Sequence, residues 1–148
     1  MNIKEQYKIL EFGEYGDERG NLVVAEGNGK DIPFAIKRVF YMYGSDATVI
    51  RGQHANRKTE FVLINVSGTS KVKVDNGYET DVIELNKPRM GLYLPPMLWK
   101  DMYDFSADSV LLCLASEHYD GSEYIRDYNE YLKEVRSVAA SEEKEQDK

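Results

Sequence analysis

The chain has 148 residues, a formal net charge of −7 and one cysteine. This length suits one domain with a substantial core and is too short for two independent domains. The negative charge argues against general binding to nucleic acid, and one cysteine allows no disulfide within the chain. The N-terminus has no apolar signal core, and no apolar run reaches the ~20 residues of a membrane span. We therefore expect a soluble, cytoplasmic protein without a membrane partner.

Short apolar or alternating segments recur along the chain, separated by Gly, Pro, Asn and Asp, which is typical of an all-β sandwich or barrel. The pattern predicts strands over residues 7–12, 21–26, 36–43, 60–67, 70–76, 79–85, 90–94, 99–104 and 109–115. Asn76 and Gly77 favour a type I′ hairpin turn, because both residue types tolerate positive φ. Gly68 marks a second tight reversal, and Pro95-Pro96 interrupts ladder bonding before the strand that begins at Trp99.

Only the C-terminal part has the spacing of a helix. A helix is predicted over 122–135, with Ser122 as N-cap. Its apolar stripe consists of Tyr124, Ile125, Tyr128, Leu132 and Val135. Such a stripe favours packing against the barrel over a cofactor site. From Ser137 the residues are small or charged, so we expect one domain over 1–136 and a disordered tail over 137–148.

Segment 51–61 contains the one histidine suited to acid–base chemistry. Its charged and titrating residues are His54, Arg51, Arg57, Lys58 and Glu60. The other histidine, His118, lies in a polar run typical of a surface turn. If the segment is extended, His54 and Asn56 point to the same face. Imidazole titrates near neutrality and can take up and return a proton in one turnover, so proton transfer would depend on His54.

The strand spacing and the pattern Gly52-x-His54-x-Asn56-x-x-x-Glu60 resemble the cupin superfamily of jelly-roll barrels, in which three histidines and a glutamate bind a divalent metal. In this chain Asn56 stands where the second histidine would be, and Lys100 lies near the position of the third. An amide and an ammonium group are poor metal ligands. His54 and Glu60 alone would bind a metal weakly, so we expect no metal and no cofactor.

Five segments in matching order carry a closer resemblance, over about residues 11–131. They are 17–22, 32–41, 51–56, 91–99 and 114–120. These segments resemble the sugar 3,4-ketoisomerases, which are metal-free cupins that act on dTDP-4-keto-6-deoxyglucose. Those enzymes serve the synthesis of 3-amino-3,6-dideoxyhexoses for bacterial surface glycans, such as lipopolysaccharide O-antigen and S-layer glycans. The resemblance implies an all-β cupin jelly roll with a C-terminal helix, and a homodimer that exchanges its N-terminal strand.

The resemblance also implies catalytic roles. The family motif reads Arg-Gly-x-His-Ala-His, and its histidines move protons between C3 and C4 of the hexose. His54 matches the first histidine and would be the base. Asn56 occupies the second position and has no group that titrates near neutrality. Tyr41, or a neighbouring donor, would stabilise the oxyanion of the enediolate.

The remaining site predictions concern binding of the dTDP-linked keto-deoxyhexose. Arg38 and Arg51 stand at positions suited to the phosphates, which guanidinium groups bind in a bidentate manner. Lys58 adds to this cationic cluster, and Glu60 would orient His54 or an arginine. Three further residues have a sugar contact and a purely structural role as equal alternatives: Arg19, Trp99 and Lys100.

Asn56 leaves three interpretations open. The chain is a family branch with altered proton delivery or a different sugar-nucleotide reaction, or it carries an engineered His-to-Asn exchange, or it binds sugar nucleotides without catalysis. In an active chain, His54 would perform both transfers, or a water or Tyr41 would substitute. The ligand class is the same in all three interpretations, and the configuration at C4 of the product is left open.

Overall fold

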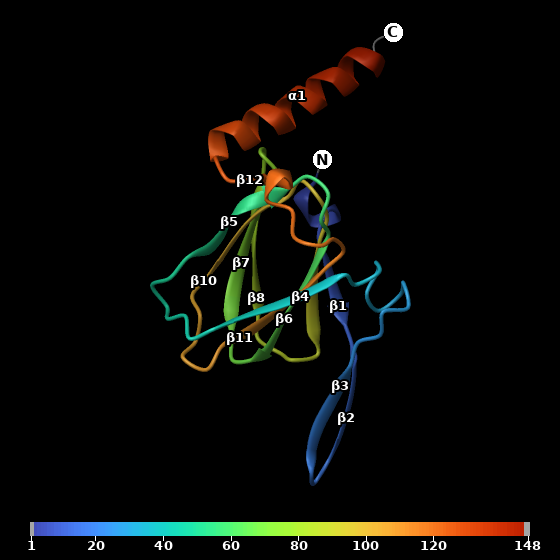
Figure 1. Ribbon diagram of the computed structural model, residues 1–148, viewed down its shortest axis with the longest axis vertical. Helices are drawn as coiled ribbons and strands as arrows, with labels where there is room; N and C mark the ends of the chain where they lie inside the picture. Colours follow the sequence, from blue (N-terminus) through green and yellow to red (C-terminus); the bar gives the residue numbers. More distant parts are fainter. Residues whose placement is uncertain (1, 147–148) are drawn as a thin grey trace.

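The computed structural model describes residues 2–146 (Figure 1). The described strands are β1 (Lys8–Glu11), β2 (Gly13–Asp17), β3 (Gly20–Val24), β4 (Arg38–Tyr43), β5 (Arg51–Asn56), β6 (Phe61–Ser67), β7 (Ser70–Asp75), β8 (Thr80–Leu85), β9 (Met90–Leu94), β10 (Trp99–Tyr103), β11 (Val110–Ala115) and β12 (Tyr124–Ile125). The described helices are two short 3-10 turns, η1 (Ile3–Glu5) and η2 (Gly121–Glu123), and the α-helix α1 (Tyr128–Gln146).

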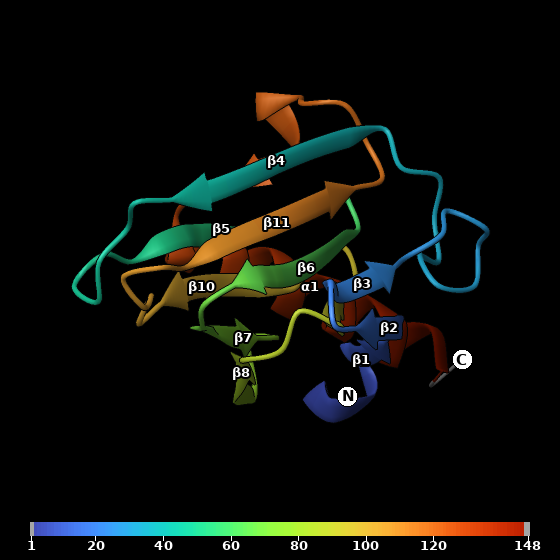
Figure 2. The ribbon, with the colours of Figure 1, turned by 90° about the horizontal axis from the view of Figure 1, so that it is seen from below.

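Two five-stranded antiparallel sheets form the body of the protein. One has the order β1-β9-β6-β11-β4 and the other β12-β5-β10-β7-β8. Figure 2 shows the layer with β4, β11 and β6 facing the layer with β5, β10 and β7. Because side chains alternate along a strand, each sheet turns one apolar face to the other. The core between them includes Leu63, Val74, Leu92, Met102 and Leu111. The all-β fold with a C-terminal helix is therefore confirmed.

Strands β2 and β3 form a separate two-stranded hairpin that projects from the body (Figure 1). The sequence predicted β3, but not β2. Residues Gly13–Asp17 contain two glycines and three exposed polar or aromatic residues, and this composition has no apolar alternation that could reveal a strand.

The C-terminal helix begins and ends later than predicted. Residues 122–127, expected as its first turns, instead belong to η2, β12 and a short connection. The helix then continues from Tyr128 through ten residues of the segment expected to be disordered, while Asp147 and Lys148 lie outside the described residues. Tyr131 anchors α1 in an apolar cluster with Ala55, Trp99 and Ile125. Within residues 2–146, no helix is both long and apolar enough to cross a membrane.

The predicted type I′ turn between β7 and β8 is wrong. The connection has four residues, 76–79, and of its residues only Gly77 has positive φ, at 90°. The Asn76 side chain accepts hydrogen bonds from the backbone N–H groups of Tyr78 and Glu79. Asn76 therefore stabilises the turn through its side chain and not through a left-handed backbone.

Candidate active site

A cavity of about 220 Å³ opens between the two sheets. It is lined by residues of β4, β6 and β11 from one sheet and of β5, β10 and β12 from the other. Its polar lining residues are Arg51, His54, Lys100, Cys113, Tyr124 and Arg126. Four of these are permanent or potential cations, and no carboxylate lines this cavity within the described residues. In a chain with a net charge of −7, this concentration of positive charge favours an anionic ligand.

A distorted backbone brings His54 to the cavity. Gly52 has φ of +83° and Gln53 has φ of +54°, and the pairing of β5 with β10 shifts register at this point. A Cβ atom at Gly52 would lie 2.9 Å from the Met102 methyl group and 3.0 Å from the Lys100 carbonyl oxygen. Glycine is therefore required both by its backbone conformation and by the close approach of β10.

The environment of His54 keeps its imidazole neutral, with one ring nitrogen free to accept a proton. Its Nδ1 lies 3.0 Å from the carbonyl oxygen of Gly52. Since a carbonyl only accepts, Nδ1 carries the hydrogen of the neutral ring and Nε2 keeps its lone pair. Burial and the nearby charge of Lys100 lower the pKa of His54 to about 4. The ring of Tyr124 packs beside the imidazole, with centroids 4.8 Å apart.

Lys100 faces His54 from the neighbouring strand. The two residues are direct cross-strand partners in β10 and β5, so their side chains project from the same face of the sheet. Lys100 is 3% exposed, and its Nζ donates to the Oδ1 of Asn56 at 3.2 Å. Nζ also lies 4.6 Å from the centre of the Phe61 ring. Burial lowers the pKa of Lys100 to about 7.

Asn56 links Lys100 to a buried carboxylate. The Nδ2 of Asn56 donates to the Oε1 of Glu123 at 2.6 Å, and Asn56 is 1% exposed. Glu123 also accepts from the Thr59 hydroxyl and from the backbone N–H of Lys58. Burial raises the pKa of Glu123, but these hydrogen bonds outweigh it and hold the pKa below its usual value. Asn56 therefore lies between a carboxylate and an ammonium group, behind the cavity wall.

Three guanidinium groups surround the cavity or its rim. Arg51 and Arg126 line it, and Arg126 packs over the Tyr124 ring. The Nη1 of Arg38 lies 3.4 Å from the Tyr124 hydroxyl oxygen, but the buried Nε and Nη2 of Arg38 have no hydrogen-bond partner among residues 2–146. Buried donors without acceptors are costly, at roughly 1–3 kcal/mol each. A ligand with anionic oxygens would satisfy them.

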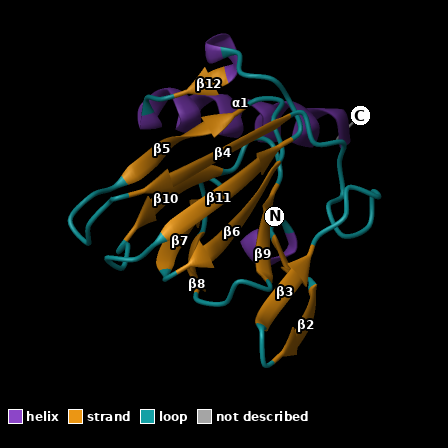
Figure 3. Cartoon of the chain, turned by 60° about the horizontal axis from the view of Figure 1, so that its bottom comes forward, coloured by secondary structure: helices purple, strands orange, loops and turns teal. Residues whose placement is uncertain are grey.

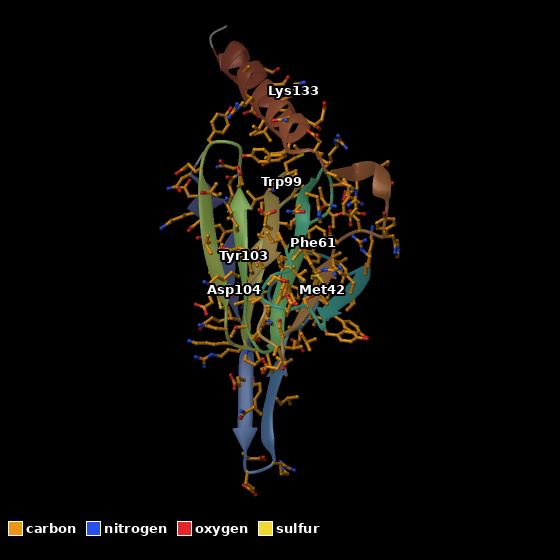
Figure 4. All side chains as sticks on the ribbon, turned by 90° about the vertical axis from the view of Figure 1, so that its left-hand side faces the viewer. Met42, Phe61, Trp99, Tyr103, Asp104 and Lys133 are labelled. Atoms are coloured by element: carbon orange, nitrogen blue, oxygen red, sulfur yellow. The ribbon has the colours of Figure 1, made fainter. Side chains whose placement is uncertain are left out.

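Two predicted site residues lie on the wrong face of their strands. Tyr41 is 61% exposed on the outer face of β4, where it stacks on Tyr43. Trp99 points away from the cavity, because it precedes Lys100 in β10, and it packs against Tyr131 of α1. Figure 4 shows Trp99 beneath the helix, away from Met42 and Phe61 of the cavity lining.

The structure also places three predicted binding residues outside the cavity. Glu60 accepts a hydrogen bond from the Tyr93 hydroxyl at 2.6 Å and does not contact His54. Lys58 borders a separate surface pocket. Arg19 lies in the turn of the β2–β3 hairpin, where it pairs with Asp17 and is exposed. Within one chain, none of the three reaches the cavity around His54.

Sequence reasoning missed Tyr124, Arg126 and Glu123. All three were assigned to the predicted helix, but Glu123 ends η2, Tyr124 begins β12 and Arg126 follows β12; Figure 3 shows β12 as a strand before α1. Tyr124 and Arg126 line the cavity, and Glu123 binds Asn56 behind its wall. Asp127, with Glu130 three residues later, was the available signal for a later helix start, because the Asp127 side chain accepts from the backbone N–H of Glu130 as an N-cap does. Cys113 also lines the cavity, and burial raises the pKa of its thiol to about 12, which leaves it protonated and unreactive. No group of three or more His, Cys, Asp or Glu side chains in the described region is arranged to hold a metal.

Comparison with known proteins identifies the family. The family model "FdtA: WxcM-like, C-terminal" matches residues 5–136. The TDP-4-oxo-6-deoxy-alpha-D-glucose-3,4-oxoisomerase of Aneurinibacillus thermoaerophilus is 40% identical over 136 residues, which is 92% of this chain and 97% of that protein. A 3,4-ketoisomerase from Helicobacter canadensis has a TM-score of 0.85 and 42% identity, over 88% of this chain and 97% of its own.

A second solved structure bears on the ligand. A histidine-to-asparagine mutant of the 3,4-ketoisomerase QdtA from Thermoanaerobacterium thermosaccharolyticum was solved in complex with TDP-4-keto-6-deoxyglucose. Its TM-score is 0.86 at 40% identity, over 89% of this chain and 95% of that chain. The two sheets thus match the cupin-like barrel of these enzymes. The chain therefore belongs to the sugar 3,4-ketoisomerase family.

Proposed function

We propose that this chain is an isomerase that moves the keto group between C4 and C3 of a dTDP-4-keto-6-deoxyhexose. The observation that carries the proposal is a neutral imidazole in a cavity that is lined by cations and no carboxylate. The cavity is smaller than the ~300–1,000 Å³ typical of a complete ligand site, so it suits the sugar ring, with the nucleotide outside it. The names of the related enzymes support the same substrate class.

His54 acts as the base of this reaction. Its Nε2 takes the hydrogen of C3 as a proton, the C–H electron pair forms the C3=C4 bond, and the carbonyl π electrons move to O4. Return of this proton to C4, together with transfer of the O3 proton to O4, gives the 3-keto product. The anionic diphosphate opposes the effect of Lys100 and raises the pKa of His54 toward neutrality, which makes the imidazole a stronger base in the complex.

Tyr124 and the arginines hold the substrate. The Tyr124 hydroxyl takes the oxyanion role that we first assigned to Tyr41, because Tyr124 packs on His54 inside the cavity. Arg38, Arg51 and Arg126 bind the diphosphate. The two buried nitrogen atoms of Arg38 without a partner in the described part of the chain, Nε and Nη2, are the strongest support for an anionic group at this rim.

A homodimer is the proposed assembly. Strand β1 lies at the edge of its sheet and leaves Ile9 46% exposed. The projecting hairpin exposes the apolar side chains of Tyr15 and Leu22, at 63% and 61%. Open strand edges and apolar arms of this kind suit contact with a second copy of the chain. Light scattering tests this, and a monomeric mass at micromolar concentration would contradict it.

The biological setting follows from the product. A 3-keto sugar nucleotide is a substrate for a 3-aminotransferase, so we place the enzyme in the bacterial cytoplasm, before the assembly of amino-deoxysugars into surface glycans.

The test uses the unaltered chain with dTDP-4-keto-6-deoxyglucose and a 3-aminotransferase as the coupling enzyme. We expect a 3-amino product, loss of the C3 hydrogen in D2O, and full activity after treatment with EDTA. A chain that binds the nucleotide without loss of the C3 hydrogen would be a binding protein. Stoichiometric metal by elemental analysis, together with inactivation by EDTA, would indicate a metal-dependent cupin.

A further inference from the structure

The isomerisation moves two hydrogens, and each needs a carrier. One is bound to carbon and passes from C3 to C4, and the other is bound to oxygen and passes from O3 to O4. A single imidazole can carry the first, because C3 and C4 are neighbours. The family motif would supply a second imidazole at position 56, but Asn56 has no titrating group. A different group in this cavity must therefore serve the oxygens.

The geometry of an enediolate separates the two carriers. The C3–H bond breaks when it stands perpendicular to the plane of the C4 carbonyl, whereas O3 and O4 lie in the plane of the C3=C4 double bond. The base must approach one face of the sugar, and the group that serves the oxygens must approach its edge. His54 and Lys100 are cross-strand neighbours on β5 and β10, so two separate groups enter the cavity side by side from the same sheet.

The hydrogen bonds around Lys100 leave N–H donors of its Nζ available for a ligand. An ammonium group has three N–H donors. In the described structure Nζ makes one hydrogen bond, to the Oδ1 of Asn56, and forms no ion pair. A flip of the Asn56 side-chain amide would break the hydrogen bond that its Nδ2 donates to the Oε1 of Glu123 at 2.6 Å. Asn56 thus fixes the direction of Lys100, and two donors remain for O3 and O4.

We propose that Lys100 is the second catalytic residue and that Asn56 positions it. The ammonium group gives a proton to O4 while His54 removes the hydrogen of C3, which yields the neutral enediol. The resulting amine then takes the proton of O3 while His54 returns its proton to C4. Both side chains end the cycle as they began it, and no other reactant is needed. This inference rests on the proposed ketoisomerase function.

The surroundings of Lys100 suit such a cycle. Burial brings the pKa of Lys100 to about 7, so the amine and ammonium forms are both accessible. The titratable or charged groups that face it are His54 and Arg51 of β5, Cys113 of β11, Glu123 of η2, and Tyr124 and Arg126 beyond it. Since His54 must be neutral and Lys100 protonated, we expect kcat/KM of the unaltered chain to be bell-shaped, with limbs near pH 4 and pH 7.

The experiment compares Lys100→Arg with Lys100→Met and measures two rates in D2O, the loss of the C3 hydrogen and the formation of the 3-keto product. Arginine keeps the charge that stabilises the enediolate but cannot release a proton. Lys100→Arg should therefore keep C3 exchange within about tenfold, lose isomerisation by about a hundredfold or more, and lose the alkaline limb of the pH profile. Lys100→Met should lose both rates. Lys71→Arg, at an exposed lysine of β7, is the matched control and should change neither rate.

Two outcomes would overturn the role of Lys100. One is isomerisation by Lys100→Arg within about threefold of the unaltered chain, which would reduce Lys100 to a binding cation. The other is titration of the Lys100 Nζ above pH 9, which would exclude the cycle. It is measured by ¹⁵N NMR of the lysine side chains in the unaltered protein. This measurement does not depend on how the variants fold. Failure of the unaltered chain to exchange the C3 hydrogen would overturn the proposed function as well, so the two failures are distinguishable.

Discussion

Two buried asparagines organise the two ends of the barrel in different ways. Asn65 is fully buried in β6, where its Oδ1 accepts from Ser70 and its Nδ2 donates to the Ser109 hydroxyl and the Ser67 carbonyl. All of these partners are neutral, and every polar atom of the amide is paired. Asn56 is equally buried, but it joins the carboxylate of Glu123 to an ammonium group.

This difference in charge and in access to the cavity separates a structural polar cluster from a functional one. The Asn65 cluster closes on itself and ties β6, β7 and the start of β11 together, so its contribution is structural. The Asn56 cluster is charged, and it opens onto the cavity through Lys100. Burial of an ammonium group without an ion pair is expensive, and nothing in the packing of the barrel requires it. We interpret that cost as the consequence of a catalytic requirement.

The largest expected effect is on the cavity side. His54→Gln removes the base and keeps a polar side chain of similar length, so kcat should fall by about 10²–10⁴-fold. The thermal midpoint at pH 7 should change little, because the imidazole is already neutral there. A coupled assay measures kcat, and calorimetry measures the thermal midpoint. A variant with more than a tenth of the activity of the unaltered chain would contradict the assignment.

The free energy of unfolding should fall in acid because of His54, which lies at the charged cluster around Asn56 and Lys100. The pKa of His54 is about 4 in the folded protein, below its unfolded value of 6.5. As the pH falls below 6.5, the unfolded chain takes up a proton that the folded chain does not bind until about pH 4. Stability is therefore lost through this window, by up to ~3 kcal/mol from His54.

Urea unfolding at several pH values, compared between the unaltered chain and His54→Gln, isolates this contribution. The difference in stability between the two proteins should change between pH 6.5 and 4. A constant difference would show that His54 titrates normally in the folded protein.

Asn65→Ala tests the neutral cluster. The change leaves the buried Ser70 and Ser109 hydroxyls without their amide partner, and we expect a loss of ~2–3 kcal/mol of unfolding free energy. The value of kcat should stay within about twofold, because no member of this cluster reaches the cavity. Urea unfolding and the coupled assay measure the two effects. A large fall in kcat with a folded protein would remove the distinction between the two ends.

Asn56→His tests whether the amide at position 56 limits the rate. If the amide alone limited the rate, restoring the imidazole of the family motif would raise turnover sharply. With Lys100 as the second carrier, the new ring mainly takes away the acceptor of Lys100, and kcat should change by less than about tenfold. Steady-state kinetics at pH 7 decide between these results. A hundredfold increase would mean that Asn56 impairs this chain.

The sequence identified the family and the central residues of the site, but it could not assign every face. The structure places His54, Arg51 and Lys100 at the cavity. For Lys100 the sequence left a sugar contact and a purely structural role as equal alternatives, and the roles assigned to all three residues stay predictions. Tyr41 failed because Phe40, Tyr41, Met42 and Tyr43 are all large and apolar or aromatic. Such a strand has no polar alternation to show which residues face inward, and here Phe40 and Met42 do.

The helix boundary failed for a related reason. Tyr124 and Ile125 fit the helical spacing of Tyr128 and Leu132, so local periodicity could not separate them. Tertiary contacts decide the boundary instead, because Glu123 is buried against Asn56 and β12 pairs with the end of β5. The residues missed at the site, Tyr124 and Arg126, follow from that single error.

The most direct test of the account is the fate of the C3 hydrogen of dTDP-4-keto-6-deoxyglucose in D2O, followed by ¹H NMR with the unaltered, EDTA-treated protein. The account predicts that the C3 signal disappears while the 3-keto product forms, and that both changes stop in His54→Gln. A C3 signal that persists with the unaltered chain, or that is lost equally fast with His54→Gln, would contradict proton transfer by this imidazole.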